Sequence, residues 1–329
     1  MSPQPVVVDL LIVGAGPAGL YGAYYAGFRG LSVAVVDSLP ELGGQVCAMY
    51  PEKLIYDVAG FPSVKGRDLV SSLAEQASSA DPTYLLGRTA TLLDQDPDFD
   101  GVGVELDDGT IVRAGAMILT AGIGKFTPRE LPAASEWTGG GVSFFVPSFD
   151  EYADKDVIIV GGGDSAFDWA EHLEPVARSV TLVHRRDRFR AHRATVDKVL
   201  GSSVEVRTKA NVTRLIGEHG LEQVEITDLE TEETGLVKAQ AIVAALGFLA
   251  DLGPLREWGL ETDKRYLLVN SAMETNLPRV YAAGDVTEYP GKVRLIAVGF
   301  GEVATAVNNA AVAIDPEQSL FPGHSTDEE

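Results

Sequence analysis

Residues 6–19, VVVDLLIVGAGPAG, contain the pattern that decides the fold of this chain. The apolar run at 6–13 is typical of a strand buried in a parallel sheet. It is followed by Gly14, Gly16 and Gly19, which form a GxGxxG turn of the kind that opens a helix. The helix N-terminus after such a turn has free N–H groups and a positive dipole end, which suit a pyrophosphate.

The next strand completes the unit. The apolar run at 31–36 ends at Asp37, which is 23 residues after Gly14 (37 − 14 = 23). A carboxylate at this point accepts hydrogen bonds from both ribose hydroxyls of a dinucleotide. Strand, turn, helix, strand and terminal acid therefore predict a dinucleotide-binding βαβ unit for an unphosphorylated ribose, as in FAD or NAD.

The same layout recurs in the second half of the chain. An apolar strand at 157–160 leads into Gly161, Gly163 and Ala166, which form a GxGxxA turn. The next strand, 180–183, ends at His184, again 23 residues after the first glycine (184 − 161 = 23). This internal repeat predicts a second dinucleotide-binding domain.

The second unit has a basic segment where the first has an acid. From His184 to Lys198 there are six basic and two acidic residues, a net charge of +4 in a chain whose total is −22. Guanidinium groups bind a 2′-phosphate through charge-assisted hydrogen bonds, whereas a carboxylate repels it. The second site is therefore predicted to take NADP, and the candidates are His184, Arg185, Arg186 and Arg190.

Composition excludes several classes of protein. Lys and Arg number 26 against 48 Asp and Glu (26 − 48 = −22), so binding to nucleic acid or to an anionic membrane surface is not expected. The single cysteine, Cys47, excludes an internal disulfide, a CxxC redox pair and a multi-cysteine zinc cage, and no metal site is expected.

Residues 10–28 are uncharged, but their five glycines and Pro17 fit a strand, turn and helix better than a membrane span. Without a signal-peptide pattern, the protein is expected to be cytoplasmic.

The rest of the sequence indicates that the N-terminal and C-terminal segments form one domain, the FAD domain. Strands expected at 102–106, 110–113 and 116–121 form a meander, and 224–229, 236–238 and 241–245 are expected to repeat it. No third glycine turn follows. Instead a strand at 280–283 ends in Gly284 and Asp285 before a helical run at 303–314, which suits a carboxylate that binds flavin ribityl hydroxyls. The expected domains are 1–117 with 248–329 for FAD, and 118–247 for NADPH.

Several longer segments resemble a known family almost from end to end. The chain is similar to the thioredoxin-reductase-like class of ferredoxin–NADP⁺ reductases, an α/β fold with two Rossmann-like three-layer domains, one for FAD and one for NADPH. The segments that carry the resemblance are GAGPAG (14–19), LGGQ (42–45), YPEKLIYDVAGFP (50–62), GGGDSAFDWA (161–170), HRRDRFRAH (184–192), METN (273–276), AAGD (282–285), GFGEVATAVNNA (299–310) and HST (324–326).

The resemblance implies site residues that the pattern alone does not. Tyr50 and His324 would stack on opposite faces of the flavin, with His324 supplied by the partner subunit of a homodimer. Arg185, Arg186 and Arg190 match the arginines that bind the 2′-phosphate. The FAD contacts that the resemblance implies are Asp37, Gln45, Tyr50, Ala90, Phe126, Asp285 and Thr326.

One absence separates this chain from thioredoxin reductases. Their CxxC precedes the second glycine turn, where this chain has Phe145 and Ser148, so a dithiol mechanism is excluded. What remains is hydride transfer between NADPH and FAD and one-electron transfer to ferredoxin or flavodoxin, with hinges expected at 116–122 and 246–250. A flavin reductase or diaphorase with a quinone, oxygen or another protein as acceptor is the alternative, and a redox-sensing flavoprotein is a weaker one. Because ferredoxins are typically acidic, docking needs a basic patch, for which 184–198, Arg29, Lys53 and Lys65 are candidates.

Overall fold

The computed structural model describes residues 4–94 and 99–324. The chain folds as two compact units. The first contains Met1–Ala48, Lys53–Lys125 and Ala250–Glu329, and the second contains Met49–Glu52 and Phe126–Leu249. Apart from the short segment Met49–Glu52, the chain enters the second unit after residue 125 and leaves it after residue 249, whereas 117 and 247 were expected from the sequence. A boundary at 117 would cut β8 (Ile111–Leu119), a central strand of the first unit.

The first unit is built on a seven-stranded sheet. Its strand order is β5-β2-β1-β8-β7-β6, with β21 also paired to β8. The strands β1, β2, β5, β8 and β21 run parallel, and β6 and β7 are antiparallel to their neighbours. The remaining bounds are β1 (Val6–Val13), β2 (Val33–Asp37), β5 (Thr83–Leu86), β6 (Ala90–Asp94), β7 (Val102–Leu106) and β21 (Val280–Ala282).

The strand β8 departs from the sequence prediction. It is one continuous strand, where two short ones were expected at 110–113 and 116–121. One edge pairs with β1 from Val112 to Leu119. The other edge is shared: its first half pairs with β7 and its last three residues pair with β21. Because the β1 pairing continues past Ala114 and Ala116, no turn separates the two halves.

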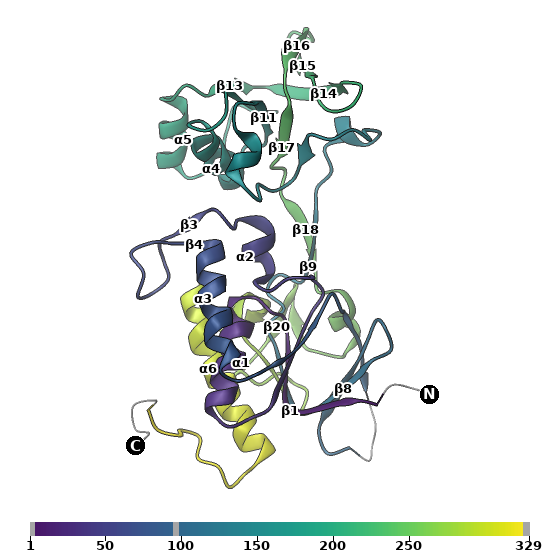
Figure 1. Cartoon of the computed structure of the whole chain (residues 1–329), viewed down its shortest axis with the longest axis vertical. Helices are drawn as coiled ribbons and strands as arrows, with labels where there is room; N and C mark the ends of the chain where they lie inside the picture. Colours follow the sequence, from purple (N-terminus) through teal and green to yellow (C-terminus); the bar gives the residue numbers. More distant parts are fainter. Residues whose placement is uncertain (1–3, 95–98, 325–329) are drawn as a thin grey trace. The chain divides into compact units, whose positions relative to one another are not determined.

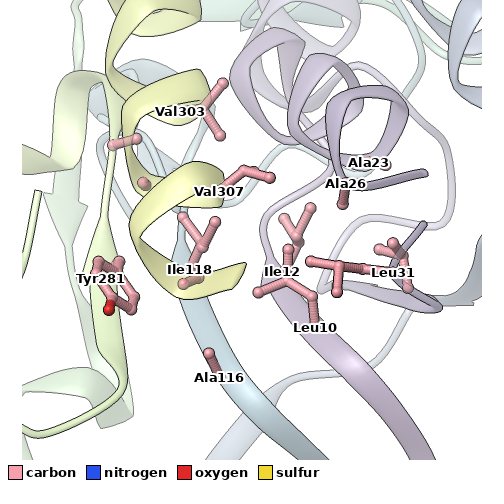
Figure 2. Close-up of a cluster of buried hydrophobic side chains, with 14 of the residues drawn as sticks. Leu10, Ile12, Ala23, Ala26, Leu31, Ala116, Ile118, Tyr281, Val303 and Val307 are labelled. Carbon is pink, nitrogen blue, oxygen red and sulfur yellow. The ribbon is translucent and has the colours of Figure 1, made fainter. Parts of the chain in front are cut away.

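Three helices cover one face of this sheet: α1 (Pro17–Phe28), α3 (Gly66–Ser78) and α6 (Ile296–Ile314) lie side by side (Figure 1). Alternate residues of β1 face opposite sides, so Leu10 and Ile12 enter the core under the helices while Leu11 and Val13 enter the core on the other face. Figure 2 shows Val303 and Val307 of α6 in the first of these cores.

Within the described residues, α6 alone is long and apolar enough to cross a bilayer by length and composition. Seven of its residues are buried, and Figure 2 shows it packed over β8. It is therefore a core helix of the first unit. It also begins earlier than the helical run predicted at 303–314.

The second unit has a five-stranded parallel sheet of order β10-β17-β11-β12-β13. Helices α4 (Asp164–Leu173) and α5 (Arg193–Leu200) pack on one face, and the antiparallel sheet β14-β15-β16 packs on the other. The strand bounds are β10 (Val142–Ser143), β11 (Asp156–Val160), β12 (Ser179–His184), β13 (Glu205–Thr208), β14 (Ala210–Ile216), β15 (Gln223–Asp228), β16 (Thr234–Lys238) and β17 (Ala241–Ala244).

The second predicted meander is wrong in its last strand. The strands β15 and β16 pair antiparallel as expected, but β17 joins the parallel sheet beside β11, and β14 completes the antiparallel sheet instead. The apolar run AIVA is buried on both faces, as a central parallel strand requires.

Smaller elements complete the chain. The strands β9 (Lys125–Pro128) and β18 (Phe248–Asp251) pair as a two-stranded ribbon. The other elements are α2 (Gly44–Met49), β3 (Leu54–Ile55), β4 (Val64–Lys65), β19 (Thr262–Asp263), β20 (Tyr266–Leu268), β22 (Thr287–Glu288) and 3₁₀ turns at Pro132–Ala134, Phe149–Tyr152, Gly253–Glu257 and Gly284–Val286.

Candidate functional site

The glycine turn after β1 is closed toward the sheet and open on its outer side. Gly14 has φ +118°, and a Cβ there would overlap the Thr120 carbonyl. The Thr120 hydroxyl donates to the Gly14 carbonyl oxygen at 2.8 Å, and Gly14 N–H donates to the Val36 carbonyl oxygen at 2.8 Å. A Cβ on Gly16, by contrast, would meet nothing within 4 Å. The turn thus has an exposed backbone surface at the N-terminus of α1, where a phosphate group can approach.

Asp37 fastens the end of β2 to this turn. Its Oδ2 accepts the Ala15 N–H at 2.6 Å, and its Oδ1 accepts the Leu39 N–H at 2.8 Å. Burial raises the pKa of the Asp37 carboxyl, and the two backbone hydrogen bonds act in the opposite direction. Each carboxylate oxygen keeps a lone pair, so the group can still accept hydrogen bonds from two hydroxyls beside the turn.

Two further predicted site residues, Gln45 and Asp285, are 240 positions apart in the sequence but in contact in the fold. The Gln45 side-chain amide donates to Asp285 Oδ2 at 3.4 Å. Gln45 lies on α2, whose first residue, Gly44, would place a Cβ 3.1 Å from the Gly16 Cα. The open glycine turn, Asp37, Gln45 and Asp285 all belong to the first unit. An open backbone cradle together with separated carboxylates and an amide fits the pyrophosphate, ribose and ribityl groups of FAD.

The other residues expected to contact FAD are more scattered. Ala90 is buried in the core at the start of β6. Tyr50 and Phe126 belong to the second unit, where Tyr50 packs against the core under α4 and Phe126 contacts the rings of Phe145 and Phe248. His324 is exposed, with its ring edge-on to Phe321 at 5.1 Å between centroids. Thr326 lies outside the described residues.

The second glycine turn reproduces the first. Gly161 N–H donates to the Val183 carbonyl oxygen at 3.0 Å, and a Cβ on Gly161 would overlap the Ala245 carbonyl. Gly163 precedes α4 and is open, with nothing within 4 Å of a Cβ, while Ala166 is buried against the sheet. The second unit therefore also presents a backbone cradle at a helix N-terminus.

The segment after β12 folds back over this turn. Arg190 N–H donates to the Gly162 carbonyl oxygen at 2.7 Å, and His192 N–H donates to Asp164 Oδ1 at 2.8 Å. The His184 ring lies against Gly162, with Nε2 3.2 Å from the Arg188 carbonyl oxygen. Burial lowers the pKa of His184, and the neighbouring arginines lower it further, although the Arg188 carbonyl opposes the shift.

Four arginines are left exposed beside the turn. Within residues 4–94 and 99–324, none of their side chains forms an ion pair with an acidic group. Their charges are therefore available to an anion at the end of β12, as a 2′-phosphate requires. They are Arg185, Arg186, Arg188 and Arg190.

Phe145 and Ser148, which the resemblance implies stand in place of two cysteines, have structural roles here. The Phe145 ring contacts Phe126 edge-on at 6.1 Å, and the Ser148 hydroxyl accepts the Asp150 N–H at 3.3 Å at the start of a 3₁₀ turn. The lone Cys47 is half-buried, and burial together with the nearby Glu41 raises the pKa of its thiol. A thiol in that state is a poor nucleophile.

Two features escaped the sequence analysis. Arg29, expected as a docking residue, is 9% exposed and holds the C-terminal segment instead. Its guanidinium donates to the side chains of Asn308 and Gln318, both at 2.9 Å, and to the Ser319 and Leu320 carbonyl oxygens at 2.9 and 3.3 Å. The second feature is a buried ion pair between Lys292 and Glu302, next to Gly284. Neither follows from local sequence, because both join positions that only the folded chain brings together.

Comparison with known proteins gives a consistent result. The chain matches the pyridine nucleotide-disulphide oxidoreductase family over residues 8–313. It is 68% identical over 329 residues to a ferredoxin–NADP reductase of Nocardioides sp. strain JS614, covering 99% of both chains. It is 61% identical over 327 residues to one of Saccharopolyspora erythraea, again covering 99% of both. The structure of T. acidophilum thioredoxin reductase matches with a TM-score of 0.76 and 27% identity, over 93% of this chain and 98% of that one. This match confirms the predicted fold class.

Proposed function

The chain belongs to the pyridine nucleotide-disulphide oxidoreductase family, and we propose that it is a ferredoxin–NADP reductase that uses FAD and NADPH. One observation in the structure carries this assignment. The two glycine turns are built alike, but Asp37 ends the strand at the first and a cluster of exposed arginines follows the strand at the second. The first therefore suits a ribose with free hydroxyls, and the second suits a ribose with a 2′-phosphate.

In the first unit, the backbone at Gly16 would receive the FAD pyrophosphate and Asp37 the adenosine ribose. Asp285, held beside Gln45, would accept hydrogen bonds from the ribityl chain. Bound FAD supplies the chemistry of accepting a hydride and releasing electrons one at a time. The protein groups bind and orient it. Burial raises the pKa of the Cys47 thiol, and the chain has no second cysteine with which it could form a disulfide.

In the second unit, the open backbone at Gly163 would receive the NADPH pyrophosphate. Arg185, Arg186 and Arg190 would bind the 2′-phosphate, and His184, kept neutral by its lowered pKa, would lie under the adenosine ribose. No second cysteine is present to accept electrons from a reduced flavin as part of a disulfide. An external one-electron acceptor is the consistent alternative, which agrees with the ferredoxin in the names of the relatives.

The assembly and location of the enzyme are further parts of the proposal. We expect a cytoplasmic homodimer in which His324 of one subunit reaches the flavin of the other, and in which Tyr50 stacks on the opposite face. We also expect the basic segment 184–198 to contribute to docking of ferredoxin or flavodoxin. Arg29 is withdrawn from that surface because its guanidinium is committed to the C-terminal segment.

An anaerobic experiment tests the assignment. NADPH should bleach the yellow protein, and cytochrome c should then be reduced only when ferredoxin is added. Bleaching without ferredoxin-dependent transfer would instead indicate a diaphorase with another acceptor. A protein that binds no flavin would contradict the assignment altogether. If the basic segment steers docking, the second-order rate with ferredoxin should fall as salt is raised, and a rate that rises with salt would exclude that role.

A further inference from the structure

A buried ion pair lies directly behind the predicted flavin-binding acid. The Lys292 side chain is 1% exposed and the Glu302 side chain 4% exposed, and their charged atoms are 2.5 Å apart. Glu302 stands in the second turn of α6, within the GFGEVATAVNNA segment, and no role in the proposed function has been assigned to it. Both residues belong to the first unit.

Both members of this pair form several hydrogen bonds. Glu302 Oε1 accepts from Lys292 Nζ and from the Tyr289 hydroxyl, the latter at 2.6 Å. Glu302 Oε2 accepts the Gly284 N–H at 2.7 Å. The Lys292 ammonium in turn donates to the Gly284 carbonyl oxygen at 2.9 Å and lies over the Tyr289 ring. The pair therefore grips the amide on one side of Gly284 and the carbonyl on the other.

Gly284 is also in van der Waals reach of two helices. It has φ +80°, and a Cβ there would lie 3.4 Å from the Ala18 Cβ in the first turn of α1. A Cβ on Gly299 of α6 would likewise lie 3.4 Å from the Gly284 Cα. Gly284 thus sits between α1 and α6, with its polar groups held by the ion pair. The residue that follows is Asp285, whose carboxylate accepts from Gln45.

We propose that Glu302 is a positioning residue for the cofactor: together with Lys292 and Tyr289 it fixes the peptide groups on both sides of Gly284, and so aims the Asp285 carboxylate at the flavin ribityl chain. This inference rests on the proposed function, which places FAD in the first unit. Glu302 itself is enclosed, and it acts on the ligand only through the peptide that it holds.

The energetics favour a geometric role over a stabilising one. Removing two charges from water costs about as much as their attraction returns, so an apolar pair of similar size would hold the helix equally well. An apolar pair, however, could not bind an N–H and a C=O of one residue at once. What the ion pair adds is the orientation of the two peptide groups that flank the Gly284 Cα, and that orientation is needed where Asp285 must meet a ligand.

The test is a double-mutant cycle on the full chain, with FAD removed and titrated back. In Glu302→Gln the side chain keeps its size, but its NH₂ group replaces one carboxylate oxygen. This donor must face another donor, either the Gly284 N–H or the Lys292 ammonium. Asp285→Asn removes the ligand-facing carboxylate. Each single variant is expected to weaken FAD binding about tenfold or more. The double variant should lose no more than Asp285→Asn alone, because Glu302 acts through Asp285.

Controls separate positioning from general damage. Asp94→Asn breaks another partly buried ion pair of the same unit, with Arg113, and should leave the dissociation constant for FAD within about twofold. NADP⁺ binding by the same apoproteins should be unchanged. If Glu302→Gln does not fold, Lys292→Met combined with Glu302→Gln replaces the pair without an unpaired buried charge, and it should show the same weakening of FAD binding.

Three results would overturn the proposal. They are FAD affinity unchanged in Glu302→Gln, losses that add fully in the double variant, and Asp285→Asn without effect on FAD binding. In each case the wild-type chain would still bind FAD and NADP⁺, so the proposed function would stand. Failure of the wild-type chain to bind FAD would instead refute the proposed function and this inference with it.

Discussion

Replacing Arg185 and Arg190 together with alanine removes two guanidinium groups from the segment that follows β12. Both side chains are exposed, and within residues 4–94 and 99–324 neither forms an ion pair, so their removal leaves no buried group unsatisfied. The fold should therefore survive, and the loss should fall on the ligand that carries a 2′-phosphate. NADH, which lacks that phosphate, is the natural internal comparison.

The size of the effect follows from the exposure of these side chains. A hydrogen bond to a charged group contributes about 1.5–3 kcal/mol, and solvent and salt reduce exposed contacts toward the lower limit. Two contacts of about 1.5 kcal/mol give about 3 kcal/mol. Since about 1.4 kcal/mol is a factor of ten, kcat/KM for NADPH should fall about 100-fold, mainly through KM, while kcat/KM for NADH stays nearly constant.

The assay is steady-state oxidation of each nucleotide with ferricyanide as a small electron acceptor, at low and at moderate salt. Ferredoxin is left out because the same basic segment is proposed to contribute to its docking. Arg193→Ala is the matched control, because it removes the same charge from the same segment, but from an exposed pair with Asp197 at 3.7 Å. It should change KM for NADPH less than about threefold. An equal loss with NADPH and NADH in the double variant would mean that these arginines support the fold. No loss with either would mean that the 2′-phosphate binds elsewhere.

Three further outcomes are expected. Gly14→Ala should lower the melting midpoint of the apoprotein, because φ +118° and the Thr120 carbonyl leave no place for a methyl group. Gly16→Ala should leave the midpoint unchanged and weaken FAD binding, because the space beside Gly16 is open. Equal midpoints for the two variants would contradict this difference between the two glycines. Arg29→Ala should make proteolysis within residues 315–323 about tenfold faster, with Arg29→Lys intermediate, since three hydrogen bonds from Arg29 hold that segment. Burial and Glu302 raise the pKa of Tyr289 from 10.0 to about 12, so its contribution to unfolding free energy is present below pH 10 and is lost as pH rises through 12. The pH dependence of wild-type stability in that window should exceed that of Tyr289→Phe by up to about 1.4 kcal/mol per pH unit, and identical slopes would refute the shift.

Sequence patterns over short distances predicted the fold class and the first strand, turn and helix of this protein. The strand, glycine turn and helix at 6–28 could be recognised because each depends on residues close in sequence, and the predicted α/β class is confirmed by the thioredoxin reductase match. The end of β2 at Asp37 followed from spacing alone, and its carboxylate does reach the turn. Local periodicity and turn chemistry were sufficient for these features.

Long-range contacts explain the errors. Arg113 looks like the end of a strand, but its guanidinium is held by Asp94 at 2.8 Å, so the charge fits inside the continuous β8. The start of α6 was expected too late because Gly299 and Gly301 weaken a helical pattern, whereas in the fold Gly299 lets the helix approach Gly284. Lys292 and Glu302 look like surface charges in so acidic a chain. In the fold they are buried against Gly284 and Tyr289.

The insertion of the second unit within the first has a consequence for the order of synthesis. All of the second unit has left the ribosome's active site by residue 249, but the first still lacks β21 and α6. Completing α6 takes 65 more residues (314 − 249 = 65), or roughly 3–13 s at about 5–20 residues per second. During that interval the last residues of β8 have an open edge, and the apolar face of α1 is uncovered. The nascent chain can therefore finish its arginine-bearing nucleotide site while Asp285, and with it the flavin site, is still to be made.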